Sequence, residues 1–314
     1  MPTRDHSSLA VEEYFLLWAA RRSGILGALL DTAGSPEAVA READVTEHAA
    51  RVVIDSLSDL GFVKQVGAEY EITNRALGFL AKRDVRSIGR LPHTLDMFDM
   101  WTDLPETMQT GDAPALPDEW TRNRLGAHAA TDDATVRARV TAAVREAPNA
   151  DCVLDICGAS GAYAIEFAAR GYEATLLDAP AVIDAVAPML GHRDVRTVAA
   201  NVPAFETDDQ YGLVFAADVT SRYDAAANRT LLGHAFDALE PGGTLVLVDT
   251  LRDGSPAAVR ARIRALGVGH GDAYSAETYR TWLDEAGFSA VSVRPVPGDE
   301  RTAVIARRPE RAVD

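Results

Sequence analysis

The sequence predicts an α/β protein: a doubly wound, Rossmann-like sheet in its second half, preceded by a smaller all-α/winged-helix domain. Three observations support this prediction. The 314 residues are more than one ordinary domain of roughly 150 residues contains, so we expect two domains. The content of 47% hydrophobic and 25% charged residues is typical of globular proteins and excludes collagen-like or mostly disordered chains. From residue 152 onward, apolar runs of strand length alternate with helical patterns, as in a parallel sheet covered by helices.

The first 85 residues have the pattern of a winged helix. Ser35 before Pro36 predicts an N-cap with proline at the first helical position, and this helix runs through Ala43. A second helix starts at Thr46-Glu47 and stops at Gly61. The short runs 62–66 and 70–73 then surround a glycine turn, which predicts a β-hairpin.

Charge argues against DNA binding by this domain. A winged helix that binds DNA presents Lys or Arg to phosphates, whereas the second helix carries Glu47, Asp55 and Asp59 against Arg51. We therefore predict no nucleic-acid partner and a role in dimerisation or in covering a pocket. The helices of residues 8–30 carry a broad apolar surface, which predicts a homodimer.

The whole chain is strongly acidic. Asp and Glu number 47 against 31 Lys and Arg, a net charge of -16, and only Lys64 and Lys82 are lysines. Such a surface repels nucleic acid and anionic membranes, and molar salt screens its self-repulsion. We expect a salt-adapted cytoplasmic protein; the alternative is an ordinary acidic protein with an arginine-biased composition.

Cys152 and Cys157 lie five positions apart in one apolar run. An extended strand would point them to opposite faces, too far apart to bridge, so neither a disulfide nor a metal site is expected.

Residues 86–149 are expected to form a helical linker that covers the substrate, and residues 150–314 to form the sheet domain. The terminal runs 290–296 and 302–306 surround Pro297-Gly298-Asp299-Glu300 and predict a closing hairpin. The preceding strands are expected at 152–156, 173–178, 195–200, 213–217 and 244–250, with Pro241-Gly242-Gly243 as a turn before the last of them.

A ligand site is expected at the carboxyl ends of the first two strands. The first ends in Asp155-Ile-Cys-Gly-Ala-Ser-Gly161, a glycine turn that lets a ligand approach the backbone. Asp178 ends the second and can accept hydrogen bonds from both hydroxyls of a ribose. The absence of G-x-G-x-x-G argues against a dinucleotide, and a plain strand-to-helix turn is the alternative.

With these features and the closing hairpin, the chain resembles the S-adenosylmethionine-dependent small-molecule O-methyltransferases, over about residues 8 to 308. The resemblance implies a class I methyltransferase domain that binds S-adenosylmethionine. The D-x-G-x-G-x-G loop of that family falls on Asp155, Cys157, Ala159 and Gly161, so two glycines are replaced. The cofactor residues that the resemblance implies are Asp155, Gly158, Gly161, Asp178, Asn201 and Val202.

Catalysis is where the sequence departs most from this family. The His-Asp-Trp run that carries the family's base falls on Ser221, Arg222 and Tyr223. The supporting Glu falls on Ala273, next to Asp272. His270 and Asp272 remain weak candidates for a base, and a solvated loop histidine is the alternative for His270.

We therefore predict a methyltransferase that methylates a small molecule by proximity, without a histidine base. One alternative is a relative that binds the cofactor but has another activity or none. The other is a winged-helix transcriptional regulator.

Overall fold

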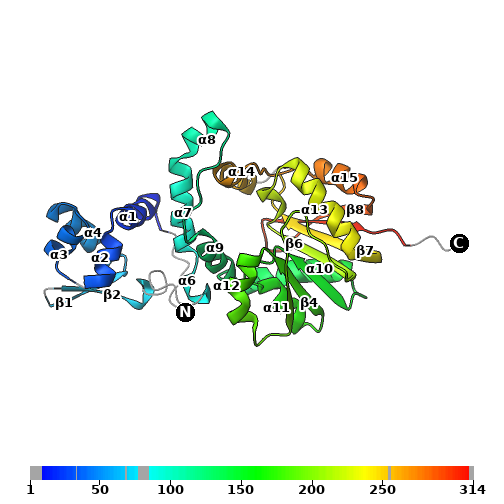
Figure 1. Cartoon of the computed structure of the whole chain (residues 1–314), viewed down its shortest axis with the longest axis horizontal. Helices are drawn as coiled ribbons and strands as arrows, with labels where there is room; N and C mark the ends of the chain where they lie inside the picture. The colour runs from blue at the N-terminus through cyan, green and yellow to red at the C-terminus, as the bar shows by residue number, and fades with distance from the viewer. Residues whose placement is uncertain (1–8, 33, 68, 77–84, 254–255, 311–314) are drawn as a thin grey trace. The chain divides into compact units, whose positions relative to one another are not determined.

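The computed structural model describes residues 9–310 except 33, 68, 77–84 and 254–255 (Figure 1). It divides into two compact units. The first comprises residues 1–102 and 117–130, and the second residues 103–116 and 131–314. The stretch 86–149, predicted as one helical segment, is therefore shared between them. The roles predicted for the three segments remain predictions.

The first unit begins with four helices and a hairpin. Ser35 and Thr46 cap α3 and α4 as predicted, because their side-chain oxygens accept the backbone N–H groups of Ala38 and Ala49. The two hairpin strands pair antiparallel, with Val63 opposite Ile72. The elements are α1 (Val11–Arg22), α2 (Ile25–Thr32), α3 (Pro36–Glu42), α4 (Glu47–Asp59), β1 (Val63–Val66) and β2 (Glu69–Ile72).

Three later helices complete this unit: α6 (Val85–Ile88), α7 (Leu91–Thr102) and α9 (Trp120–Ala129). Arg21 of α1 pairs with Asp96 of α7 at 2.7 Å, and Asn123 of α9 donates to the same buried carboxylate at 2.8 Å. A buried carboxylate is stable when it is paired and hydrogen-bonded, so Asp96 joins three helices.

The second unit is built on a seven-stranded sheet in the order β5-β4-β3-β6-β7-β9-β8. All neighbouring pairs are parallel except those of β9, which is antiparallel to β7 and β8. The order reverses between β3 and β6, so the carboxyl ends of these strands form the topological switch point. The strands are β3 (Cys152–Ile156), β4 (Glu173–Asp178), β5 (Val195–Ala199), β6 (Tyr211–Ala217), β7 (Leu239–Asp249), β8 (Ser289–Pro295) and β9 (Thr302–Arg307).

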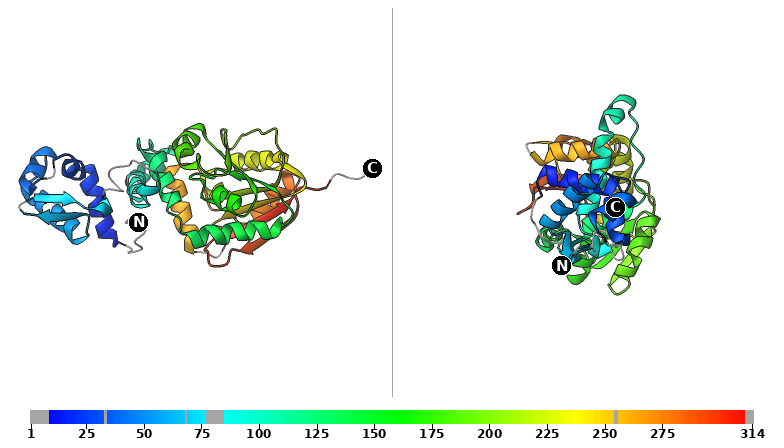
Figure 2. Two further views of the ribbon diagram at one scale, coloured as in Figure 1. Left: turned by 90° about the horizontal axis from the view of Figure 1, so that it is seen from below. Right: turned by 90° about the vertical axis from the view of Figure 1, so that its left-hand side faces the viewer.

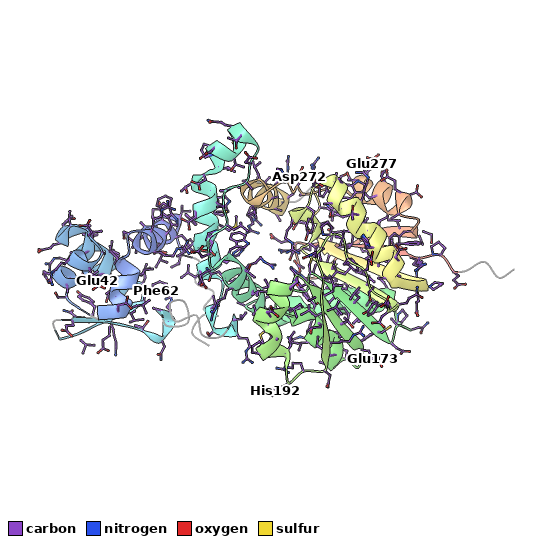
Figure 3. All side chains as sticks on the ribbon, in the orientation of Figure 1. Glu42, Phe62, Glu173, His192, Asp272 and Glu277 are labelled. Atoms are coloured by element: carbon purple, nitrogen blue, oxygen red, sulfur yellow. The ribbon has the colours of Figure 1, made fainter. Side chains whose placement is uncertain are left out.

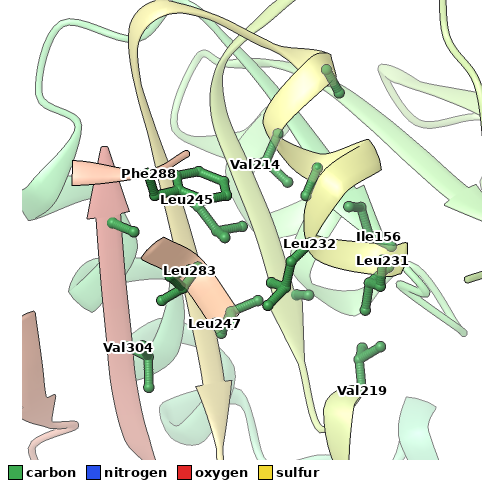
Figure 4. Close-up of a cluster of buried hydrophobic side chains, with 14 of the residues drawn as sticks. Ile156, Val214, Val219, Leu231, Leu232, Leu245, Leu247, Leu283, Phe288 and Val304 are labelled. Atoms are coloured by element: carbon green, nitrogen blue, oxygen red, sulfur yellow. The ribbon is translucent and has the colours of Figure 1, made fainter. Parts of the chain in front are cut away.

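Helices cover both faces of this sheet, since successive strand residues point to opposite sides. On one face Phe215 of β6 contacts Tyr163 and Phe167 of α11 (Ala162–Ala169). On the other face, Val214 belongs to a buried cluster formed with α13 (Ala225–Ala238) and α15 (Ala276–Glu285), shown in Figure 4. The predicted doubly wound α/β fold is confirmed.

The remaining helices of this unit are α8 (Leu104–Thr110), α10 (Asp133–Glu146), α12 (Pro180–Leu190) and α14 (Pro256–Val268). Helix α10 packs beside α11, on the side of the sheet opposite α13 (Figure 2). Helix α14 lies against α8 and against the short 3-10 turn Thr220–Arg222 that follows β6.

The turn predicted at Pro241-Gly242-Gly243 lies inside a strand instead. Strand β7 already pairs with β6 at Leu239, opposite Tyr211, and the register then shifts before Thr244 pairs with Leu213. Gly242 has a φ of +82°, so the chain does change direction there. The predicted turn is therefore wrong: these residues form a bulge within the ladder.

Candidate active site

The loop after β3 keeps a glycine-like backbone where glycines are replaced. Cys157 has a φ of +55° and Ala159 a φ of +50°, and Gly161, which precedes α11, has a φ of +75°. An L-residue pays roughly 1–2 kcal/mol for this left-handed conformation. Tertiary contacts hold it: Cys157 N donates to the Leu177 carbonyl at 2.7 Å and Gly161 N to the Gly158 carbonyl at 2.8 Å.

The two remaining glycines are required by packing inside the protein. A β-carbon on Gly158 would lie 2.2 Å from Leu176 Cδ1 and 2.3 Å from Asp155 Oδ2. One on Gly161 would lie 3.0 Å from Leu190 Cδ2. A β-carbon on Gly158 would therefore collide with the protein itself, whereas Gly161 is favoured by its φ of +75° and by tight packing on Leu190. Both reasons differ from the ligand approach that the sequence suggested.

Asp155 is fully buried and is the penultimate residue of β3. Among the described residues, neither of its carboxylate oxygens has a hydrogen-bond partner. The pKa of Asp155 is raised well above its usual range, mainly by burial and secondly by the negative charge of Asp178. An unpaired acid buried beside the loop fits a site that receives a donor group from a ligand.

Asp178 lies across the same loop at the end of β4. Its Oδ2 accepts the backbone N–H of Ala159 at 3.0 Å, and its Oδ1 accepts that of Ala179 at 2.8 Å. Each oxygen retains a second lone pair that can accept a ribose hydroxyl. Asp178 therefore has acceptor capacity left for a ligand at this edge.

The residues predicted to lie near the adenine, Asn201 and Val202, follow β5. Asn201 is exposed and Val202 is half-buried. Tyr223, from the loop after β6, donates its hydroxyl to the Val202 carbonyl at 3.4 Å. The loops after β5 and β6, which the sequence separates by about twenty residues, are thus in contact at the carboxyl edge.

The turn on which the family's His-Asp-Trp run is predicted to fall is firmly anchored. Asp249, at the end of β7, accepts Thr220 N at 3.0 Å and Thr220 Oγ1 at 2.6 Å. Thr220 Oγ1 also lies 2.5 Å from the hydroxyl of buried Tyr279. Ser221 follows on this rigid support and is half-buried.

The structure brings His270 and Asp272 to this turn. Gly271, between them, packs on the Ser221 backbone. Asp272, in the loop between α14 and α15 (Figure 3), pairs with Arg252 and, at 2.9 Å, with Arg262. Asp272 is therefore held between two guanidinium groups. His270 is exposed.

Sequence reasoning missed a buried ionic cluster beside the same edge. Arg139 of α10 pairs with Asp218 at 2.8 Å and with Asp299 at 2.6 Å, and Arg301 pairs with Asp218 at 2.8 Å. Tyr163 accepts a hydrogen bond from Arg139 at 2.7 Å. Asp218 directly follows buried β6, so the end-of-strand signal that identified Asp178 could have identified Asp218 as well.

Comparison with known proteins identifies the fold's chemistry. A family profile described as "Methyltransferase domain" matches residues 128–293, which is 166 of 314 residues and more than half of the chain. The chain belongs to this methyltransferase family. It is an S-adenosylmethionine-dependent enzyme, as its resemblance implied.

Two curated relatives of this methyltransferase come from Streptomyces. It is 26% identical over 299 residues to a 3-hydroxy-5-methyl-1-naphthoate 3-O-methyltransferase of Streptomyces sahachiroi, covering 88% of this chain and 86% of that one. It is 32% identical over 163 residues to a 3-amino-4-hydroxybenzoate 4-O-methyltransferase of Streptomyces cremeus, covering 49% and 45%.

Solved structures share the fold of this methyltransferase at low identity. A mitomycin 7-O-methyltransferase has a TM-score of 0.70 at 18% identity, covering 95% of this chain and 94% of that chain. Human N-acetylserotonin methyltransferase in complex with S-adenosylmethionine has a TM-score of 0.66 at 19% identity, covering 94% of both. Over the part of the chain that the structure describes, no metal-binding cluster is found and no helix is long and apolar enough to cross a membrane.

Proposed function

We propose that this methyltransferase transfers a methyl group to a hydroxyl of a small aromatic acid. The two curated relatives are named for methylating a hydroxynaphthoate and an aminohydroxybenzoate, both of which are aromatic carboxylates. The observation that carries the proposal is the sheet edge where Asp155, Asp178 and the Thr220–Tyr223 turn meet. The two acids offer hydrogen-bond acceptors to a nucleoside cofactor, and the turn beside them has a fixed backbone.

S-adenosylmethionine, when bound, supplies an electrophilic methyl group on a sulfonium sulfur. The chain's own contribution is positional. Asp178 orients the ribose, and the loop of residues 157–161 fixes the cofactor's depth. Holding two reactants near 3 Å and on axis removes much of the entropic barrier to a displacement.

No histidine stands at the usual position of the base, and Ser221 cannot take a proton near neutral pH. A base is needed only when the acceptor starts protonated. We propose that the acceptor enters as an oxyanion, or that its hydroxyl is acidic enough to ionise at working pH. His270 is then not required, and Asp272 remains in its pairs with the two arginines.

The test is turnover of hydroxybenzoates and hydroxynaphthoates with S-adenosylmethionine, measured by product mass. Ser221→Ala and His270→Ala should each change turnover by less than about tenfold, since one neutral hydrogen bond contributes about 0.5–1.5 kcal/mol. A thousandfold loss with cofactor binding intact would identify a general base. Cofactor binding without methylation of any acceptor would favour a relative with another activity.

We also propose that the first unit is a winged-helix module used for dimerisation. Support comes from the hairpin after α4 and from exposed Val11 and Phe15, one turn apart on α1, whose exposed fractions are 72% and 48%. Phe15 stacks on Trp18 and meets Phe98 edge-on, which extends the apolar surface. Light scattering in molar KCl should give the mass of a dimer; a monomer at micromolar concentration would contradict this. Salt-dependent binding to DNA would instead indicate a winged-helix transcriptional regulator.

Salt adaptation is proposed from the charge balance alone. With a net charge of -16 and two lysines, self-repulsion should destabilise the fold in dilute buffer. The melting temperature should rise from about 0.1 to 2 M KCl, because the Debye length falls to near 3 Å at 1 M. A melting temperature that does not change with salt would remove the proposal.

A further inference from the structure

One buried guanidinium group bridges the start of α11 and the end of β6. Arg139 of α10 is 3% exposed, and its Nη1 donates to the Tyr163 hydroxyl at 2.7 Å and to Asp218 Oδ2 at 2.8 Å. Its Nε donates to Asp299 Oδ2 at 2.6 Å. A guanidinium group is planar and its N–H groups point in fixed directions, so the three partners are held at set distances from one another.

The contact with Tyr163 fixes the start of α11. Tyr163 is the second residue of this helix and lies two positions after Gly161, the last residue of the loop 157–161. Its ring makes an edge-on contact with Phe215 of β6, with the ring centres 5.3 Å apart. The side chain is therefore held by its ring and by its hydroxyl. A displacement of Arg139 would move the start of the helix and the loop that precedes it.

The contact with Asp218 fixes the start of the turn after β6. Asp218 is the first residue beyond β6, and its φ of +54° lies in the left-handed region that L-residues seldom adopt. Its N–H donates to the Val248 carbonyl at 2.9 Å, so its backbone is held to β7 while Arg139 holds its carboxylate. Thr220, two residues later, begins the turn that carries Ser221. The direction in which this turn leaves the sheet therefore depends on the contacts of the Asp218 side chain.

The closing hairpin holds Arg139 itself in place. Asp299, in the turn between β8 and β9, has a side chain that is only 4% exposed and accepts Arg139 Nε. Arg301, just beyond it, pairs with Asp218 at 2.8 Å and with Asp299 at 3.6 Å. Two arginines and two acids balance in charge, and a largely buried polar network whose members are paired holds one defined arrangement. Arg139 is thus a fixed point to which the start of α11 and the end of β6 are both tied.

We propose that Arg139 is a positioning residue for methyl transfer, and that it sets the distance between the loop 157–161 and the turn that carries Ser221. Arg139 acts through Tyr163 and Asp218. In the transfer, a C–O bond to the acceptor oxyanion forms as the C–S bond of the sulfonium breaks along the same line, which leaves a neutral thioether. A misplacement of about 1 Å can slow such a step by about 100-fold. The inference rests on the proposed function, because it needs the cofactor at this loop and the acceptor at this turn.

The test compares Arg139→Gln and Arg139→Lys with wild type in the full chain, in constant molar KCl. The kcat is measured with a hydroxybenzoate or hydroxynaphthoate that wild type methylates, and calorimetry measures S-adenosylhomocysteine. Arg139→Gln should lower kcat by at least about tenfold more than it lowers the affinity for S-adenosylhomocysteine, because it alters the geometry between two bound reactants. Arg139→Lys keeps the charge but not the planar fork, so it should recover part of kcat.

A milder variant, Tyr163→Phe, removes one hydroxyl from the bridge and keeps the ring. Its control is Tyr172→Phe, because Tyr172 follows the same helix and packs on Phe167 with ring centres 5.9 Å apart. Tyr163→Phe should lower kcat by about three- to tenfold, whereas Tyr172→Phe should leave it unchanged. Adding Tyr163→Phe to Arg139→Gln should lower kcat by less than about twofold further, because both substitutions break the same bridge.

Several results would overturn the inference. They are equal losses in kcat and in affinity for S-adenosylhomocysteine in Arg139→Gln, unchanged kcat in that variant, or independent effects of the two substitutions when combined. If melting curves show that Arg139→Gln does not fold, the tyrosine variants decide, and equal kcat in Tyr163→Phe and Tyr172→Phe overturns the inference. Wild-type protein that binds S-adenosylhomocysteine but methylates none of the acceptors would contradict the proposed function, and the inference with it.

Discussion

Gly271 packs directly on the backbone of Ser221: a β-carbon at Gly271 would lie 2.0 Å from the Ser221 carbonyl oxygen. The loop that carries His270 and Asp272 is therefore in contact with the turn that contains Ser221. Ser221 and residues 270–272 therefore form one surface. The geometry of this surface depends on residue 271 having no side chain.

Gly271→Ala should lower the melting temperature and reduce turnover by at least about tenfold. The clashing atom belongs to the backbone, which cannot move aside as the end of a flexible side chain can. Binding of S-adenosylhomocysteine should weaken as well, because the displaced turn also carries Tyr223, whose hydroxyl contacts the Val202 carbonyl at the proposed cofactor edge. The control is Gly269→Ala, since a β-carbon there meets nothing within 4 Å. Equal behaviour of the two variants would contradict the packing.

Ala159→Gly should cost little stability although the residue is buried. Its φ of +50° is unfavourable for alanine, so glycine relieves strain that offsets its larger unfolded-state entropy. Ala164→Gly, at a buried position inside α11, should cost about 1 kcal/mol or more, because glycine is a poor helix residue. Chemical denaturation at constant salt compares the two. A larger loss at residue 159 would mean that its backbone is not strained.

The buried Asp155 should give the protein an unusual pH dependence. Its folded pKa is raised above the unfolded value near 3.9, so the folded state binds more protons than the unfolded state above that pH. Its contribution to the free energy of unfolding is therefore fully present at low pH and is lost as pH rises through the folded pKa. Asp155→Asn should melt higher than wild type at pH 7, and the difference should shrink toward pH 4.

Asp218→Asn is the matched comparison for this prediction. Burial opposes the ionised form of Asp218, but Arg301 and Arg139 lower its pKa overall. Its stabilisation is present above the unfolded pKa and is lost as pH falls through the folded one. Asp218→Asn should therefore melt lower than wild type at pH 7. If Asp155→Asn and Asp218→Asn both raised or both lowered the melting temperature at pH 7, the opposite directions of the two pKa shifts would be refuted.

Much of the fold could be predicted from local pattern. Strands β3 and β4 have the predicted bounds, because each is an apolar run that ends at a polar or turn residue. The caps Ser35 and Thr46 were predictable since capping depends on only a few neighbouring residues.

The site was predictable only in part. The sequence could place Asp155 and Asp178 at strand ends, but it could not show that Cys157 and Ala159 keep a left-handed backbone, because tertiary contacts enforce it. The pair between Arg139 and Asp299 joins residues 160 positions apart, and no local pattern encodes such a contact.

The most direct test of the account is calorimetry of S-adenosylhomocysteine with wild type, Asp178→Ala and Asp184→Ala in molar KCl. Asp184 is an exposed acid on α12 and controls for the change in charge. Wild type and Asp184→Ala should bind alike. Asp178→Ala should bind at least about tenfold more weakly, because the charged acceptor of the ribose hydroxyls is lost. Each hydrogen bond to a charged acceptor contributes about 1.5–3 kcal/mol. Folded wild-type protein that gives no binding heat, or Asp178→Ala that binds as wild type does, would contradict the cofactor site described above.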